Sequence, residues 1–135
     1  MGAVEWVRAI AIDPQSDSIV WAATGSGTFK STDAGGSWNL VTTSADRIHI
    51  DALNSSIVYL TYGSGLRRTH DGGTTWTTLS IATPEDVLGL AIDARNSNTL
   101  YAGTWGAGVY KSVDGGATWF PSNQGIATEA IWGIA

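Results

Sequence analysis

The chain contains no cysteine among its 135 residues, which excludes disulfides and thiolate metal sites. It also lacks any apolar run approaching the roughly 20 residues that a membrane-spanning helix requires. The first residues, Met1 to Glu5, have neither the basic nor the apolar region of a signal peptide. We therefore expect a soluble chain with no membrane partner. The compartment stays open, because a signal peptide is removed from mature proteins and many secreted bacterial proteins lack cysteine.

Basic residues are scarce. Seven Lys and Arg residues stand against twelve Asp and Glu residues, which gives a formal net charge of −5. A nucleic-acid-binding surface needs a basic patch, so nucleic acid is excluded as a partner. The two histidines, His49 and His70, are too far apart to have the spacing of metal ligands. We predict no metal site and no cofactor.

Glycine and aromatic residues are abundant, by contrast. Seventeen glycines interrupt the chain every few positions, and seven Trp and four Tyr residues lie among Val, Ile and Thr. This composition is typical of short β-strands joined by tight turns. No segment shows the 3.6-residue periodicity of a helix over a helix-sized window. The composition therefore predicts an all-β protein.

One motif, Ser/Thr-x-Asp-x-Gly-x-x-Trp, occurs three times. Its aspartates are 38 and 43 residues apart (33 to 71, 71 to 114), and a second series, Asp13, Asp51 and Asp93, keeps nearly the same spacing. A unit of about 40 residues with four short strands has the size of a β-propeller blade. The repeated positions that define the motif are Ser31, Asp33, Gly35, Trp38, Thr69, Asp71, Gly73, Trp76, Ser112, Asp114, Gly116 and Trp119.

The repeat predicts an all-β fold of three four-stranded antiparallel blades in a ring closed by oligomerisation. The blades cover about 7–43, 46–81 and 86–123, and an extra inner strand covers about 130–135. Each fourth strand is predicted to start at the motif tryptophan. The other predicted strands are 7–12, 47–50 and 87–92 (first), 19–24, 57–62 and 99–104 (second), and 28–31, 66–69 and 109–112 (third).

The motif has a structural logic. An Asp carboxylate accepts hydrogen bonds from turn amides, and the glycine two residues later permits a positive φ. The Ser/Thr hydroxyl is expected to donate to a strand carbonyl, and the tryptophan to bury its ring against the neighbouring sheet. A catalytic group is needed once per site and not once per blade. We therefore interpret Asp33, Asp71 and Asp114 as turn caps, and Asp13, Asp51 and Asp93 likewise.

These motifs resemble the Asp-box, or bacterial neuraminidase repeat, family of β-propellers. The family includes sialidases, xyloglucanases, sortilin-like receptors and photosystem assembly factors. The segment from Ile12-Asp13-Pro14 to Gly36-Ser37-Trp38 is most similar to xyloglucanase and other multi-blade repeats. The resemblance implies a propeller whose Asp boxes are structural and lie away from any catalytic centre. It also implies a carbohydrate-related, extracellular bacterial origin.

Polar residues outside the repeat are the better candidates for ligand contact. Arg47 and His49 leave one face of a first strand, which lines the central channel of a propeller, where other blades carry Ala11 and Ala91. Trp105 is an insertion in a Gly-rich turn. The candidate ligand-binding residues are therefore Arg47, His49 and Trp105, with solvated or packing roles as the alternative. Arg67, Arg68 and His70 are interpreted as an exposed strand face or salt-bridge partners. Trp6 and Trp132 are interpreted as core or inter-blade packing residues, with a role as sugar-stacking platforms as the alternative.

No catalytic constellation of the family transfers to this chain. Sialidases hold the sugar carboxylate with an arginine triad beside a tyrosine nucleophile, and xyloglucanases need two acids across a cleft between propellers. The arginines here do not occupy matching places in successive blades. Glu5, Glu85, Asp86 and Glu129 lie in connections before first strands but form no assignable pair. We predict a protein that is not an enzyme and has no catalytic residues.

Propellers close with four to eight blades, so three blades leave two open faces that favour association. We expect a homodimer of six blades in preference to a trimer of nine. The segment 129–135 parallels 5–11, which offers a strand for exchange between subunits. The predicted function is a non-catalytic, self-assembling scaffold with a ligand-binding face, either a fragment or a piece engineered from a larger repeat protein. The alternatives are a fragment of a secreted glycoside hydrolase and a receptor-like module that binds a glycan or a peptide.

Overall fold

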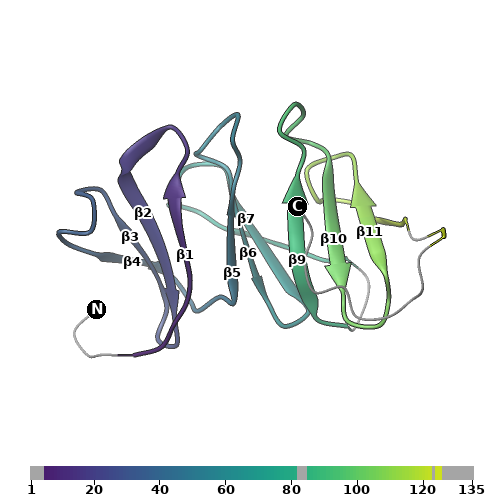
Figure 1. Ribbon diagram of the computed structural model, residues 1–135, viewed down its shortest axis with the longest axis horizontal. Coiled ribbons are helices and arrows are strands. Elements are labelled where there is room, and N and C mark those ends of the chain that lie inside the picture. Colours follow the sequence, from purple (N-terminus) through teal and green to yellow (C-terminus); the bar gives the residue numbers. More distant parts are fainter. Residues whose placement is uncertain (1–4, 82–84, 123, 126–135) are drawn as a thin grey trace.

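The computed structural model describes residues 5–81, 85–122 and 124–125, and its regular structure in this part is entirely β. Three four-stranded antiparallel sheets stand side by side along the molecule (Figure 1). Within each sheet the strands follow one another in chain order, as in a meander. No helix in the described part is long and apolar enough to cross a membrane.

The three sheets use successive parts of the chain. The predicted all-β class and the number of sheets and strands are confirmed, and the sheets resemble propeller blades. The predicted inner strand at 130–135 lies outside the described residues. The first sheet contains β1 (Val7–Asp13), β2 (Ser16–Thr24), β3 (Thr28–Ser31) and β4 (Asn39–Thr42); the second contains β5 (Arg47–Ile50), β6 (Val58–Tyr62), β7 (Gly65–Thr69) and β8 (Thr77–Leu79); the third contains β9 (Val87–Ile92), β10 (Leu100–Thr104), β11 (Val109–Ser112) and β12 (Phe120–Pro121).

The strand register repeats from sheet to sheet. Ala11 pairs with Trp21 in the first sheet, His49 with Tyr59 in the second, and Ala91 with Tyr101 in the third. The next strand continues each row, because Trp21, Tyr59 and Tyr101 pair with Lys30, Arg68 and Lys111. Directly paired residues of antiparallel strands lie on the same face of a sheet. The three rows therefore define equivalent positions in the three sheets.

The fourth strands begin one residue later than predicted, at Asn39, Thr77 and Phe120. The motif tryptophan still belongs to the turn. In the second and third sheets its indole nitrogen donates to the carbonyl of the motif glycine, at 3.1 Å for Trp76 and 2.8 Å for Trp119. This bond ties the indole ring of Trp76 and Trp119 to its own turn.

The core lies between the sheets. One cluster joins Trp21 of the first sheet to Val58 and Leu60 of the second. A second cluster joins Tyr59 of the second sheet to Leu100 of the third. Among the described residues, these two clusters therefore cover both faces of the middle sheet and one face of each outer sheet. Burial of these apolar faces, at about 25 cal/mol per Å², is the main force that holds neighbouring sheets together.

The sheets come closest at their first strands, since β5 contacts both β1 and β9. This is how the inner edges of propeller blades meet. The outer face of the first sheet, by contrast, is open: Ile10 and Ile12 are 67% and 64% exposed. Trp6 is also exposed, so it does not pack into a core of the single chain, and its packing between blades of an assembly stays a prediction.

Candidate functional site

Each Asp-box turn is built around one buried hydroxyl. The Ser31 Oγ atom donates to Asp33 Oδ1 at 2.8 Å and accepts from the Gly35 amide at 2.8 Å. Thr69 and Ser112 make the same pair of bonds in the other two turns. The expectation that this hydroxyl donates to a strand carbonyl is wrong. The carboxylate two residues along is a charged and therefore stronger acceptor.

The three aspartates serve the turns. The Ser37 hydroxyl and then the Ser37 amide lower the pKa of Asp33 to about 2, and the Thr118 hydroxyl and amide lower that of Asp114 to about 2. The Thr75 hydroxyl holds the pKa of Asp71 well below its usual range. A carboxyl group that is ionised at neutral pH has no proton to give as a general acid. The hydrogen bonds therefore support a capping role for all three.

The motif glycines have left-handed backbones, as predicted. Their φ angles are 88° at Gly35, 102° at Gly73 and 95° at Gly116. Gly73 has a second constraint, because a Cβ atom there would lie 2.8 Å from the Trp21 ring of the neighbouring sheet. The second turn therefore needs glycine for its conformation and also for the close approach of another sheet.

The second aspartate series caps the turns after the first strands. Asp13 Oδ1 accepts from the Gln15 amide at 2.7 Å, Asp51 Oδ1 from the Leu53 amide at 2.8 Å, and Asp93 Oδ1 from the Arg95 amide at 2.8 Å. These are Asx turns, in which a side chain satisfies a backbone donor two residues later. The capping role predicted for this series is confirmed.

The basic residues of the third strands connect neighbouring sheets. Lys30 Nζ donates to the Gly72 carbonyl at 2.9 Å, and Arg68 Nη1 donates to the Gly115 carbonyl at 2.7 Å. Arg68 was expected to lie on an exposed face or in a salt bridge; it instead binds the Asp-box turn of the next sheet. The sequence does carry a signal for this role, since Lys30, Arg68 and Lys111 occupy equivalent positions.

Arg67 is also an intersheet residue. Its side chain is 8% exposed and donates to Thr42 Oγ1 at 2.6 Å and to the Ser44 carbonyl at 3.1 Å. The guanidinium lies 4.8 Å from the centroid of the Tyr62 ring. The interpretation of Arg67 as an exposed cation is wrong, because hydrogen bonds and an aromatic face compensate for its burial.

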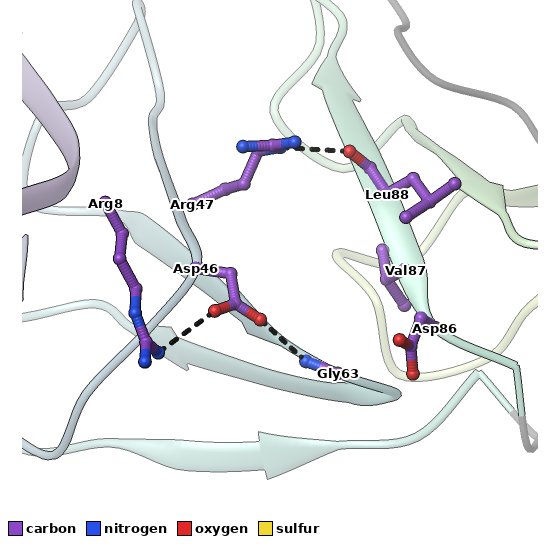
Figure 2. Close-up of a pocket in the computed structure, with 7 residues that line it drawn as sticks. All are labelled: Arg8, Asp46, Arg47, Gly63, Asp86, Val87 and Leu88. Atoms are coloured by element: carbon purple, nitrogen blue, oxygen red, sulfur yellow. Dashed lines mark hydrogen bonds and ion pairs between the residues drawn. The ribbon is translucent and has the colours of Figure 1, made fainter. Parts of the chain in front are cut away.

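A pocket of about 390 Å³ lies where the first strands of the three sheets begin (Figure 2). Arg8 comes from β1, Arg47 from β5, and Val87 and Leu88 from β9, so all three sheets contribute. The full lining is Arg8, Asp46, Arg47, Gly63, Asp86, Val87 and Leu88.

Internal bonds fix the charged walls of the pocket. Arg8 Nη1 pairs with Asp46 Oδ1 at 3.2 Å, and Asp46 Oδ2 accepts from the Gly63 amide at 3.0 Å. Arg47 donates from Nε to the Leu88 carbonyl at 3.1 Å, as Figure 2 shows. This bond orients the Arg47 guanidinium, and its two terminal nitrogens can still donate to a ligand.

The three predicted ligand-contact residues, Arg47, His49 and Trp105, do not all lie at the pocket. Arg47 lines the pocket. Trp105 is 48% exposed and borders it, because its amide donates to the Asp86 carbonyl at 2.9 Å. His49 is not part of the lining: its Nε2 atom is buried with no hydrogen-bond partner among the described residues. Burial, and secondarily the charge of Arg47, lowers the pKa of His49 to about 4, so its ring is neutral at neutral pH.

Within residues 5–81, 85–122 and 124–125, no three His, Asp or Glu side chains are grouped so that they could hold a metal ion. Two guanidinium groups and two carboxylates surround an opening with an apolar wall at Val87 and Leu88. Such a lining suits a polar ligand that offers hydrogen-bond acceptors to Arg47.

The three sheets and their turns resemble Asp-box propeller blades, and comparison with solved structures agrees. An ancestral GH74 enzyme superposes with a TM-score of 0.76 at 25% identity, covering 87% of this chain and 18% of that chain. The GH74 enzyme of Niastella koreensis gives 0.72 at 27% identity, with 85% and 22% covered. YCF48 from Cyanidioschyzon merolae gives 0.71 at 17% identity, with 89% and 38% covered.

These likenesses confirm the predicted structural resemblance to Asp-box β-propeller proteins. This chain spans well under half the length of each of the three. No protein-family model matches the sequence, and no curated protein matches it. The particular function therefore has to follow from the chain's own residues.

Proposed function

We propose that this chain is a non-catalytic scaffold whose blades assemble with a second copy into a ring and present the pocket around Arg47 as a binding face. The observation that carries the proposal is the open face of the first sheet. Ile10, Ile12 and Leu40 are 67%, 64% and 62% exposed there. Several exposed apolar side chains on one face of a sheet are the kind of surface that marks an interaction site.

The equivalent residues of the second sheet show what such a surface does. Ile48 and Ile50 occupy the positions of Ile10 and Ile12, and both pack against the cluster around Trp21. The first sheet therefore offers the same kind of face, and none of the three described sheets packs against it. Two copies supply six blades and three copies nine. Only six falls within the four to eight blades with which propellers close, which favours a homodimer.

The pocket supplies the binding face. Arg47 is exposed and is oriented by its bond to Leu88, so it needs little ordering when it meets a ligand. A glycan or a peptide that presents carboxylate or hydroxyl oxygens fits this donor. Completion of the ring would extend the same rim around the remaining first strands.

A second candidate function is a fragment of a glycoside hydrolase, favoured by the 25% and 27% identity to two GH74 enzymes. Hydrolysis of this kind requires one carboxylic acid that donates a proton and a second carboxylate across the substrate. The Asp-box carboxylates are occupied by their turns. Asp46 in the pocket accepts from both Arg8 and Gly63, which leaves it poorly placed to act on a sugar.

Two assays separate the candidates. The scaffold proposal expects no turnover of xyloglucan or of sialosides, and binding to a glycan array or a peptide library that is lost in Arg47→Ala. Arg95→Ala is the matched control, because Arg95 is exposed in a turn away from the pocket. Turnover of either substrate would overturn the non-catalytic assignment. Binding that survives Arg47→Ala would show that the pocket is not the binding face of the scaffold.

A further inference from the structure

One contact between sheets occurs twice in the structure. In the first instance, Lys30 lies over the Trp21 ring, 5.2 Å from its centroid, and donates to the Gly72 carbonyl at 2.9 Å. In the second, Arg68 and the Tyr59 hydroxyl both donate to the Gly115 carbonyl, at 2.7 and 2.9 Å. Each instance has a donor half, a cation beside an aromatic ring, and an acceptor half, the Asp-box turn of the next sheet.

The third sheet carries a donor half that meets no Asp-box turn among the described residues. Lys111 and Tyr101 occupy the positions of Lys30 and Trp21, and the Lys111 ammonium lies 5.4 Å from the centroid of the Tyr101 ring. Trp21 and Tyr59 are each 1% exposed, whereas Tyr101 is only partly buried. Phe120, which pairs with Lys111, is 57% exposed on the same face.

The first sheet carries the matching acceptor half. Ala34 corresponds to Gly72 and Gly115, and its amide donates to the Ser18 carbonyl at 2.9 Å as theirs do to Ser56 and Asn98 at 3.0 Å. This shared bond seats the three turns in the same way on their own sheets. Gly72 is partly buried and Gly115 is buried, but Ala34 is exposed.

The residue after Ala34 gives an independent sign of the same open surface. The motif glycines Gly73 and Gly116 are buried, and a Cβ atom on either would come within 3 Å of a side chain. Gly35 is exposed, and a Cβ atom there would meet only Trp38, at 3.9 Å. The space that Trp21 occupies in front of Gly73 is therefore open in front of Gly35.

We propose that the Lys111 ammonium of one copy donates to the Ala34 carbonyl of a second copy, with the Tyr101 ring against Gly35. This inference rests on the proposed self-assembly and names its partner and its contacts. Ile10 and Ile12 of the second copy then take the places that Ile48 and Ile50 have inside the chain. The contact is head to tail, so two copies that close a ring form it twice.

A second copy is the occupant that the structure favours, because one sequence supplies both halves. The donor half of the third sheet has the arrangement that binds an Asp-box turn at two places inside the chain. The acceptor half of the first sheet is a turn of the kind that is bound at those two places. A contact that joins different surfaces of identical subunits gives a closed ring when the rotation closes.

The first experiment measures the dimer dissociation constant by sedimentation equilibrium. Lys111→Met removes the donor and should weaken the dimer by about tenfold or more, as expected for charged hydrogen bonds lost at two junctions. Lys111→Arg should stay within about threefold of the original, because Arg68 already fills this role in the second sheet. Arg95→Met is the control for loss of an exposed cation elsewhere in the third repeat.

The outcomes separate this contact from the broader proposal. If Lys111→Met and Arg95→Met gave the same dimer dissociation constant, the Lys111 contact would be wrong, but the scaffold proposal would not be affected. A chain that stays monomeric at high concentration would overturn both, and would point to a further blade or another protein as the occupant.

A cross-linking experiment tests the head-to-tail geometry directly, since the chain has no cysteine of its own. Ala34→Cys and Lys111→Cys are made as separate variants, refolded together well above the dissociation constant and treated with a short bis-maleimide. A covalent dimer is expected only from the mixture. Cross-linking of Lys111→Cys with itself would show a head-to-head interface and contradict the proposal. Leu53→Cys, exposed in the middle sheet, mixed with Ala34→Cys is the control.

Discussion

The Lys30 ammonium donates to the carbonyl oxygen of Gly72 at 2.9 Å, and this bond joins the third strand of one sheet to the Asp-box turn of the next. The Asp box therefore has two structural tasks. Inside its own sheet it closes the hairpin between the third and fourth strands. Towards the preceding sheet it presents a backbone acceptor and a glycine that leaves room for a side chain of that sheet, Trp21 at Gly73 and Leu79 at Gly116. Both tasks are intersheet or intraturn packing, and neither involves chemistry on a substrate.

The buried hydroxyl of the Asp box should be needed for stability. Thr69→Val removes a donor to Asp71 and an acceptor for the Gly73 amide in a site that is 1% exposed. An amide left buried without a partner costs about 1–3 kcal/mol. Urea unfolding should show a loss of that size. Thr78→Val, at an exposed strand position, should change stability by less than about 0.5 kcal/mol; equal losses in the two variants would argue against the role of the hydroxyl.

The motif glycines should differ in their tolerance of alanine. Gly73→Ala pays about 1–2 kcal/mol for a left-handed backbone and a further 1–3 kcal/mol, roughly, for collision with the Trp21 ring. Gly35→Ala has the first cost alone in the single chain. In thermal unfolding of a dilute, monomeric sample, Gly73→Ala should therefore have a lower midpoint temperature than Gly35→Ala. The reverse order would contradict the packing described between the first two sheets.

Arg67 should stabilise the contact between the first and second sheets. Arg67→Met leaves Thr42 Oγ1 and the Ser44 carbonyl without their donor, so we expect a loss of about 2 kcal/mol in urea unfolding. Arg67→Lys keeps a charged donor and should lose less. If Arg67→Met were as stable as the original chain, the buried guanidinium would not be a structural contact.

The sequence predicts the number of sheets, the turns and most strand positions, because the Asp-box motif fixes a hairpin wherever it occurs. It does not predict the role of Arg67, because that role depends on the sheet in front of it. Once the strand register is known, it indicates that Arg67 is unusual. Arg67 lies at the position that Phe29 and Tyr110 have in the other sheets, so a cation occupies an apolar position.

The pocket was predictable only in part. Arg47 is recognisable from sequence as a non-repeated polar residue on a first strand. Its neighbours Arg8, Asp46 and Asp86 come from β1 and from the connections before β5 and β9, and only the packing of neighbouring first strands brings them together. His49 shows the opposite error of sequence reasoning, since this polar residue on a first strand is partly buried, with its Nε2 atom inaccessible, and lies outside the pocket lining.

His49 should make the fold sensitive to mild acid. Its pKa is about 4 in the folded chain and 6.5 when exposed, so the unfolded chain binds the proton first as pH falls. Above pH 6.5 the neutral ring makes its full contribution to the free energy of unfolding. Roughly 2–3 kcal/mol of that free energy is lost as the pH falls towards 4. His49→Ala, which places here the residue found at Ala11 and Ala91, should remove this loss. Urea unfolding at pH 7 and at pH 4.5 compares the two chains above the range in which the Asp-box carboxylates titrate.

In the proposed dimer, the outer faces of the first and third sheets complete one another between two copies of the chain. Light scattering coupled to size exclusion measures the mass in solution directly. We expect a species of twice the 14.1 kDa chain mass that dissociates on dilution. A particle of 14.1 kDa at every concentration up to the solubility limit would contradict it.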